Sequence, residues 1–145
     1  MTATRRSLST LAWALLLASC AARQAAPLAD PAAAVMISDR LFLGRDIPGG
    51  GTVSDADWSA FLDEVVTPRF PLGLTIWHAD GQWRGEGGST VREPVLVVEV
   101  LHPPGAEHDR AVAEIADEYR RRFRQEAVLR VTVEARSRLF EREGP

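Results

Sequence analysis

Two segments of the chain place their apolar residues on one side of a helix. The first begins at Ser54, which has capping-box spacing with Asp57, and it ends at Thr67-Pro68 because the residue before a proline avoids the helical region. Its apolar face consists of Trp58, Phe61, Leu62, Val65 and Val66. The second covers residues 107–124 and has a stripe formed by Val112, Ile115, Ala116, Tyr119 and Phe123. This spacing predicts two amphipathic helices.

The segments around the helices have the pattern of β-strands. Residues 35–45, VMISDRLFLGR, predict a first strand, which the Pro-Gly-Gly-Gly loop after it cannot continue. Residues 74–79 alternate between apolar and polar, and Asp80-Gly81 predicts a tight turn after which residues 82–84 return as a short extra strand. Residues 94–101 are apolar at nearly every position, as in a central strand.

The last element completes a repeating order. Residues 128–135 alternate, with Leu129, Val131 and Val133 on one face of the predicted strand and polar residues on the other. The order is therefore β-α-β-β-α-β. The economical arrangement is an α+β ferredoxin-like βαββαβ sandwich, in which two helices lie on one face of an antiparallel sheet.

The first twenty residues have the features of a lipoprotein export signal. Two arginines and no acid precede a short apolar run, residues 11–18, which is too short to cross a bilayer. Leu17-Ala18-Ser19-Cys20 then resembles the bacterial lipobox, and this resemblance implies cleavage before Cys20 and a diacylglycerol on its thiol. The alternative is an ordinary signal peptide with an incidental cysteine.

This interpretation divides the chain into three parts. They are a signal peptide (1–19), the lipidated cysteine with a flexible Ala/Pro-rich tether (20–34), and a single ferredoxin-like domain (35–145). We expect the protein to be exported and lipid-anchored, at the periplasmic face of the outer membrane or at the cell surface. The membrane is then a partner of the protein through the lipid anchor. Several acyl chains hold a protein stably at a membrane, whereas a single chain binds only marginally.

Charge and cysteine content narrow the function classes. Removal of the signal leaves 15 arginines against 20 acidic residues, a formal charge of −5, and the chain has no lysine. We expect no nucleic-acid partner, because phosphate binding requires a basic face. With Cys20 lipidated, no thiol remains for disulfides, thiol catalysis or a thiolate metal site.

A set of short motifs runs through residues 41–133. They are Phe42-x-Gly44-Arg45, Trp58, Thr67-Pro68-Arg69-Phe70-Pro71, Gly73-Leu74-Thr75, Gly81-Gln82-Trp83 and Gln125-Glu126. This set resembles the bacterial family known as domain of unknown function 3574. The resemblance implies a small secreted or lipid-anchored domain, and it implies no established activity.

Four residues are candidates for ligand binding. Arg69, between two prolines, is placed either to clamp a carboxylate or phosphate or to form a structural pair with an internal acid or the helix carbonyls. Arg45 allows the same two interpretations. We hypothesise that Arg45 and Arg69 converge near Glu93 and line one polar pocket. Trp83 is either a stacking platform for a ring or sugar or a cover for the edge of a small core.

No motif indicates a cofactor or a metal. The Pro-Gly-Gly-Gly loop lacks the GxGxxG and GK[ST] patterns of nucleotide-binding loops. His102 to Asp109 could offer four metal ligands, but the prolines and glycine between them favour a solvated loop. We therefore expect no cofactor, no metal and no assignable catalytic residue.

These observations leave three interpretations of function. The leading one is a small binding or interaction module of the cell envelope, whose partner is a second copy meeting it through the open sheet face or another envelope protein. Its small-molecule ligand is unidentified. The alternative is a small envelope enzyme that acts on an anionic substrate through Arg69, Arg45 and Glu93. The third is a purely structural envelope component.

Overall fold

The computed structural model describes residues 30, 32–85 and 87–142. The chain divides into two units, Met1–Pro31 and Ala32–Pro145. The predicted signal peptide, Cys20 and most of the predicted tether lie outside the described residues. In the second unit the elements follow the order predicted from the sequence.

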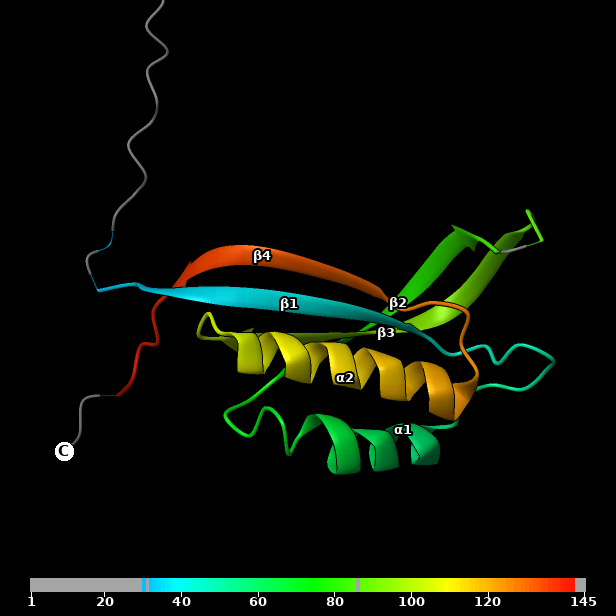
Figure 1. Ribbon diagram of the computed structural model, residues 1–145, viewed down its shortest axis with the longest axis horizontal. Coiled ribbons are helices and arrows are strands. Elements are labelled where there is room, and N and C mark those ends of the chain that lie inside the picture. Colours follow the sequence, from blue (N-terminus) through cyan, green and yellow to red (C-terminus); the bar gives the residue numbers. More distant parts are fainter. Residues whose placement is uncertain (1–29, 31, 86, 143–145) are drawn as a thin grey trace, which may run out of the picture. The chain divides into compact units, whose positions relative to one another are not determined.

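Four antiparallel strands form one sheet in the order β2-β3-β1-β4. They are β1 (Ala34–Gly44), β2 (Thr75–Arg84), β3 (Thr90–His102) and β4 (Leu129–Ser137). The helices lie together on one face of the sheet, as Figure 1 shows. They are α1 (Asp55–Phe61), which continues into the π-helical turn η1 (Leu62–Val66), and α2 (Ala106–Phe123). The predicted ferredoxin-like βαββαβ sandwich is confirmed.

The core lies between the sheet and the helices. Alternate residues of β1 and β3, including Leu41, Leu43, Leu96 and Val98, face the helices and are buried. The helices contribute the other half of the core: Trp58, Phe61, Val65, Val66, Val112, Ile115, Tyr119 and Phe123. Each such side chain contributes about 1.5–3 kcal/mol by leaving water, so this layer holds the fold together.

The first helix begins as predicted and ends differently. The Ser54 hydroxyl accepts from the Asp57 N–H, and the Asp57 carboxylate accepts from the Ser54 N–H, which completes the capping box. After Phe61 the helix widens, because the Thr67 N–H donates to the Leu62 carbonyl five residues back. This wider turn brings the chain to the Pro68 segment.

The predicted turn at Asp80-Gly81 is wrong. β2 runs straight through both residues, and Gly81 pairs with Glu93 of β3. Glycine at position 81 allows the Val95 side chain to pack against the β2 backbone, because an added Cβ would lie 2.5 Å from the Val95 Cγ2. It is not needed for a turn. The reversal occurs instead at residues 85–89, where the Gly85 N–H donates to the Ser89 carbonyl, so β3 begins four residues earlier than predicted.

The polar face of β4 points toward the helices, and its apolar face points away from them. Thr132 pairs with Asp39 and faces the helices, as does Arg130, whereas the apolar residues of the strand face away from them. Leu129 is 59% exposed in consequence. The sheet therefore has an open face that is rich in apolar side chains and that no helix covers in the part of the chain described (Figure 1).

Candidate functional site

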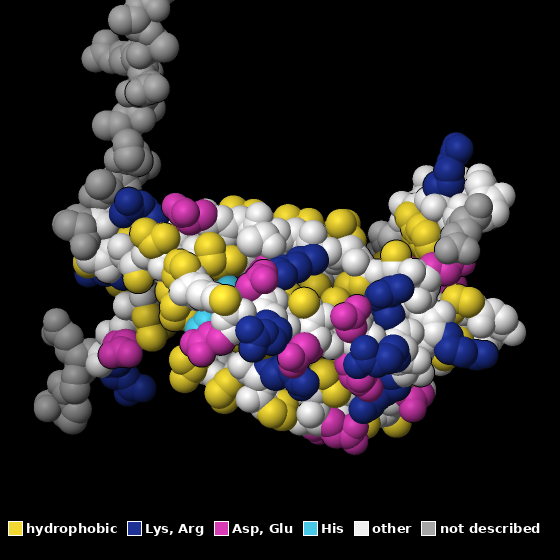
Figure 2. Space-filling view, in the orientation of Figure 1, with side chains coloured by type: hydrophobic (Ala, Val, Ile, Leu, Met, Phe, Trp, Pro, Cys, Tyr) yellow, Lys and Arg dark blue, Asp and Glu magenta, His cyan; other side chains and the backbone are white. Residues whose placement is uncertain are grey.

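A pocket of about 320 Å³ lies on the open face of the sheet, at the Gly44 end of β1. The far part of the β2–β3 hairpin curls away from the helices, as Figure 1 shows, and Figure 2 shows the hollow between the hairpin and the rest of the sheet. Apolar surface dominates the walls. The lining residues with side chains on this face are Phe42, Ala79, Trp83, Glu93, Val95 and Leu129.

The Glu93 carboxylate is held in a fixed place in this pocket. Its Oε1 accepts a hydrogen bond from Trp83 Nε1 over 2.9 Å, and its Oε2 accepts one from the Asp46 N–H over 3.2 Å. It lies directly over Gly44, where an added Cβ would come within 2.6 Å of the Glu93 Cδ. Glycine at position 44 is therefore what makes room for the carboxylate.

The surroundings of Gly44 and Asp46 are tied to the helical layer. Tyr119, which is fully buried in α2, donates its hydroxyl proton to the Gly44 carbonyl over 2.9 Å. The Gln125 side-chain amide donates to the Asp46 carbonyl, also over 2.9 Å, from the segment between α2 and β4. The pocket floor is thus built before any ligand arrives, because its hydrogen bonds come from the fold itself.

The charged residues that line this pocket are acidic. Among the described residues that line it, the charged ones are Glu93 and Asp80, and none is an arginine. A third carboxylate, that of Glu126, lies close to Gly85, with its Oε2 3.8 Å from a Cβ built at that glycine. The pocket is apolar, with the negative charge of Glu93 at its floor.

The structure brings together two of the four residues predicted to bind a ligand. Trp83 and Glu93 line the pocket and bond to each other. Arg45 instead donates to the Val53 carbonyl and pairs with Asp55 at the start of α1. Strand alternation explains this, because position 45 continues the helix-facing side of β1 whereas Glu93 points from the open face.

Arg69 is also remote from Glu93. Its Nη1 donates to the Val65 carbonyl over 2.7 Å and its Nε lies 3.4 Å from the Glu114 carboxylate of α2. These contacts place it in the helical layer, where it satisfies a carbonyl that the end of the helix leaves free. The predicted convergence of Arg45 and Arg69 on Glu93 is therefore wrong.

Several motif residues that carried the family resemblance meet at this site. Phe42, Gly44 and the Gly81-Gln82-Trp83 stretch line the pocket, and Gln125 bonds to the backbone beside it. They come from β1, β2 and the segment before β4. These motifs are far apart in the sequence, and the order of the strands in the sheet places them side by side.

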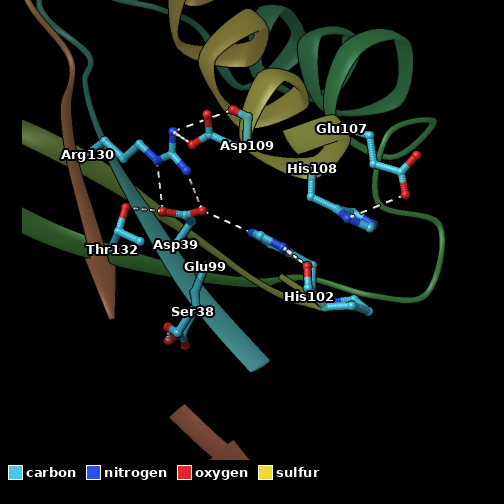
Figure 3. Close-up of polar contacts among 10 residues, drawn as sticks. Ser38, Asp39, Glu99, His102, Glu107, His108, Asp109, Arg130 and Thr132 are labelled. Carbon is cyan, nitrogen blue, oxygen red and sulfur yellow. Dashed lines mark hydrogen bonds and ion pairs between the residues drawn. The ribbon is translucent and has the colours of Figure 1, made fainter. Parts of the chain in front are cut away.

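A second polar cluster, not predicted from the sequence, lies between the sheet and α2 (Figure 3). Asp39, which is 0% exposed, accepts hydrogen bonds from Arg130 Nε over 2.8 Å and Arg130 Nη2 over 2.7 Å. It also accepts from the Thr132 hydroxyl and lies 3.0 Å from His102 Nε2. Asp109 of α2 pairs with the outer side of Arg130.

The charge of Asp39 is well compensated. Burial raises the pKa of this carboxyl, but hydrogen bonds from Arg130, Thr132 and His102 outweigh burial and lower its pKa to about 2. His102 contacts an oxygen on each side, since its Nδ1 lies 2.9 Å from the Pro103 carbonyl. Both contacts are hydrogen bonds when each ring nitrogen carries a proton.

In this cluster the Asp39 oxygens are occupied by protein groups, namely Arg130, Thr132 and His102. The His102 ring stacks on His108 with centroids 5.0 Å apart. The predicted solvated loop is confirmed at residues 103–105, which are exposed, whereas β3 extends to His102 and buries it. One signal was available in the sequence: Asp39 occupies the same strand face as Leu41 and Leu43, so its charge required a buried partner.

In the described part of the chain, no three His, Cys, Asp or Glu side chains are grouped to hold a metal ion. None of the helices that the structure describes is both long enough and apolar enough to cross a membrane.

The family model described as "Protein of unknown function (DUF3574)" matches residues 38–139, and the chain belongs to this family. The resemblance seen in the sequence motifs is thereby confirmed. The family description names no activity. No curated protein matches the chain.

Solved structures similar to this chain share its fold at low sequence identity. A phage SAM lyase in complex with S-methyl-5'-thioadenosine has a TM-score of 0.56 and 19% identity, covering 68% of this chain and 81% of that one. A phage SAM lyase in the apo state has a TM-score of 0.54 and 16% identity, covering 74% and 94%. CutA from Synechococcus elongatus has a TM-score of 0.46 and 7% identity, covering 71% and 79%. The likeness to the two phage lyase structures establishes the fold alone.

Proposed function

We propose that this family member is a membrane-anchored envelope lipoprotein whose domain binds a small molecule in the open-face pocket. The observation that carries the proposal is the Glu93 carboxylate, fixed by two hydrogen bonds in a pocket with mostly apolar walls. Binding sites for small molecules have this composition, with apolar walls and a few placed polar groups. The volume of about 320 Å³ lies at the small end of the range for such sites.

Pre-formed geometry supports binding as the function. Gly44, Tyr119 and Gln125 fix the floor through contacts that involve no ligand. Binding therefore requires little ordering of the protein, so little affinity is lost to the entropic cost of ordering. The enzyme alternative is not better supported, because Arg45 pairs with Asp55 and Arg69 donates to the Val65 carbonyl.

The test uses the mature protein extracted in mild detergent from its own cells and examined by native mass spectrometry. We expect an added mass of a small molecule in the wild type that is absent from Trp83→Ala. Arg69→Ala is the matched control, because its side chain lies in the helical layer, and it is expected to keep the added mass. Retention by Trp83→Ala and wild type alike, or loss in the control, contradicts a site at this pocket.

The anchoring part of the proposal is supported by the lipobox-like Leu17-Ala18-Ser19-Cys20 sequence. Its test is the intact mass of the membrane fraction, where lipidation adds diacylglycerol to a chain that begins at Cys20. Cys20→Ser is expected to leave the protein unlipidated and in the soluble fraction. A wild-type chain cleaved elsewhere and without lipid contradicts anchoring and leaves the pocket proposal intact.

We further propose self-association as a second candidate function, through the other end of the open face. Trp77, Leu101 and Val133 are exposed there around an Arg40–Glu99 ion pair. A second copy related by a twofold axis can oppose arginine with glutamate, so the patch is complementary to itself. Sedimentation of the mature protein tests this: a dimer that Leu101→Glu dissociates supports it, and a monomer at high concentration rules it out.

A further inference from the structure

We propose that the open-face pocket selects organic cations, meaning ligands with a positively charged group on an apolar body. This inference rests on the proposed binding function and names the chemical class of the ligand. The described structure gives the Glu93 carboxylate two hydrogen-bond donors, the Trp83 indole and the Asp46 amide, and no ion-pair partner. The carboxylate is therefore stabilised by dipoles alone, and its charge is available to a ligand.

The setting of the carboxylate strengthens its attraction for a cation. Phe42, Val95 and Leu129 line the same pocket and make its walls apolar, and a charge interacts more strongly beside apolar surface than in bulk water. A cation placed beside Glu93 leaves water but gains a partner, which compensates its desolvation. A neutral ligand gains only the apolar contact, and an anion meets repulsion from Glu93.

Among the described residues, no basic side chain lines the pocket. Asp80 lines it from a β2 position that alternates with Gly81, so its side chain points to the other face. Arg92, the neighbour of Glu93 in the chain, donates its Nε to the Gln82 side-chain oxygen over 2.9 Å. Arg45 turns to Val53 and Asp55 on the helix side. Among the described residues of the pocket wall, Glu93 is therefore the charged side chain that an approaching cation meets on the open face.

The walls favour an organic ion over a bare metal ion. Two aromatic rings, those of Phe42 and Trp83, line the pocket, and aromatic faces attract alkylammonium groups. A metal ion such as Mg²⁺ or Ca²⁺ requires several oxygen ligands, whereas no group of metal-ligating side chains occurs here among the described residues. The apolar surface is used only if the ligand has an apolar body.

The experiment compares three probes of similar size with different charges. Phenyltrimethylammonium is the cation, N,N-dimethylaniline is the neutral compound at pH 8, and benzoate is the anion. Each is titrated into the ¹⁵N-labelled mature protein in maltoside micelles. The readout is the resonance of the Trp83 indole N–H group, which donates a hydrogen bond to Glu93. This resonance is assigned by its loss in Trp83→Phe.

We expect a saturable shift of this resonance with phenyltrimethylammonium, at an affinity at least fivefold above that for N,N-dimethylaniline and with no saturation by benzoate. Glu93→Gln is expected to reduce the fivefold preference to about one. Glu114→Gln removes a carboxylate from α2, away from the pocket, and is expected to keep the preference. Should Glu93→Gln fail to fold, the comparison of the three probes on the wild type still decides the charge preference.

The outcomes separate the two levels of the proposal. Equal affinity for the neutral and cationic probes, or preference for benzoate, overturns cation selectivity while the pocket remains a binding site. No shift with any of the three probes, together with no added mass in native mass spectrometry, overturns the binding function itself.

Discussion

The Tyr119 hydroxyl donates to the Gly44 carbonyl oxygen over 2.9 Å and so joins the C-terminal part of α2 to the last residue of β1. The two residues are 75 positions apart in the chain. Burial raises the pKa of the Tyr119 phenol far above its ordinary value, so the group remains a donor at every pH the folded protein meets. One hydrogen bond thus fixes the helical layer to the floor of the pocket.

Replacing Tyr119 with Phe is expected to lower the free energy of unfolding by about 1–3 kcal/mol. The Gly44 carbonyl would stay buried without its donor, and an unsatisfied buried group costs about that much. Urea denaturation of the wild type and variant measures the difference. Thr75→Val removes an exposed hydroxyl from β2 and serves as the control, with a change within about 0.5 kcal/mol. Equal effects of the two substitutions would contradict the proposed role of the bond.

Acid sensitivity should trace to Asp39. Its pKa is lowered from 3.8 to about 2 in the folded state, so it contributes stability above about pH 4 that is lost as the pH falls through 2. The lost contribution is about 2 kcal/mol. Asp39→Asn is expected to be less stable at pH 7, because Arg130 would keep its charge without its main partner. Between pH 4 and pH 2 the variant should lose less stability than the wild type.

Urea midpoints at several pH values test this difference. Asp63→Asn, at an exposed position of η1, is the control, and its stability should follow the wild type over the same range. Parallel curves for wild type and Asp39→Asn would show that the cluster around Asp39 does not set the acid response.

Gly44→Ala is expected to displace the Glu93 carboxylate. The new Cβ would lie within 2.6 Å of the Glu93 Cδ, which is shorter than any real contact, so the side chain must move and break its bond to Trp83. The Trp83 indole resonance should shift, and affinity for phenyltrimethylammonium should fall at least fivefold. Gly87→Ala is the matched control, because an added Cβ there meets nothing within 4 Å. An unshifted indole resonance in Gly44→Ala would disprove the close packing of these groups.

Arg69→Ala should leave the pocket unchanged. Arg69 caps the Val65 carbonyl and lies at the surface beside Glu114, so its loss is expected to cost only about 0.5–1 kcal/mol of stability. Titration of the variant with phenyltrimethylammonium should give the wild-type affinity. A large loss of affinity would mean that the helical layer controls the pocket from a distance.

Local patterns in the sequence predicted the elements, and pairing between distant segments decided the rest. The capping box of Ser54 and Asp57 is local, so α1 could be placed at its first residue. Asp80-Gly81 also gave a local signal, but pairing with β3 overrode it, because Gly81 lies against Val95. No local pattern shows which partner a strand will face.

The same limit explains the candidate site. Alternation in β4 separates Leu129 from Arg130 without showing which of them points inward. Asp39 turns the polar face inward, because its buried charge needs Arg130 from 91 residues away. Trp83 and Glu93 were separate candidates, and only strand pairing places them in one pocket. Arg45 and Arg69 were assigned by charge alone, but in the fold each of them donates to a nearby backbone carbonyl.

The length of strand β1 sets the distance between the pocket and the residue at which the chain enters the domain. The chain enters β1 at Ala34, and the pocket lies at its other end, beside Gly44. Ten residues of extended strand span about 33 Å. A domain held by its N-terminal segment therefore has its pocket one strand length away from the residue at which the chain enters β1. A longer or shorter segment before β1 would change how far the pocket reaches, but not the residues that line it.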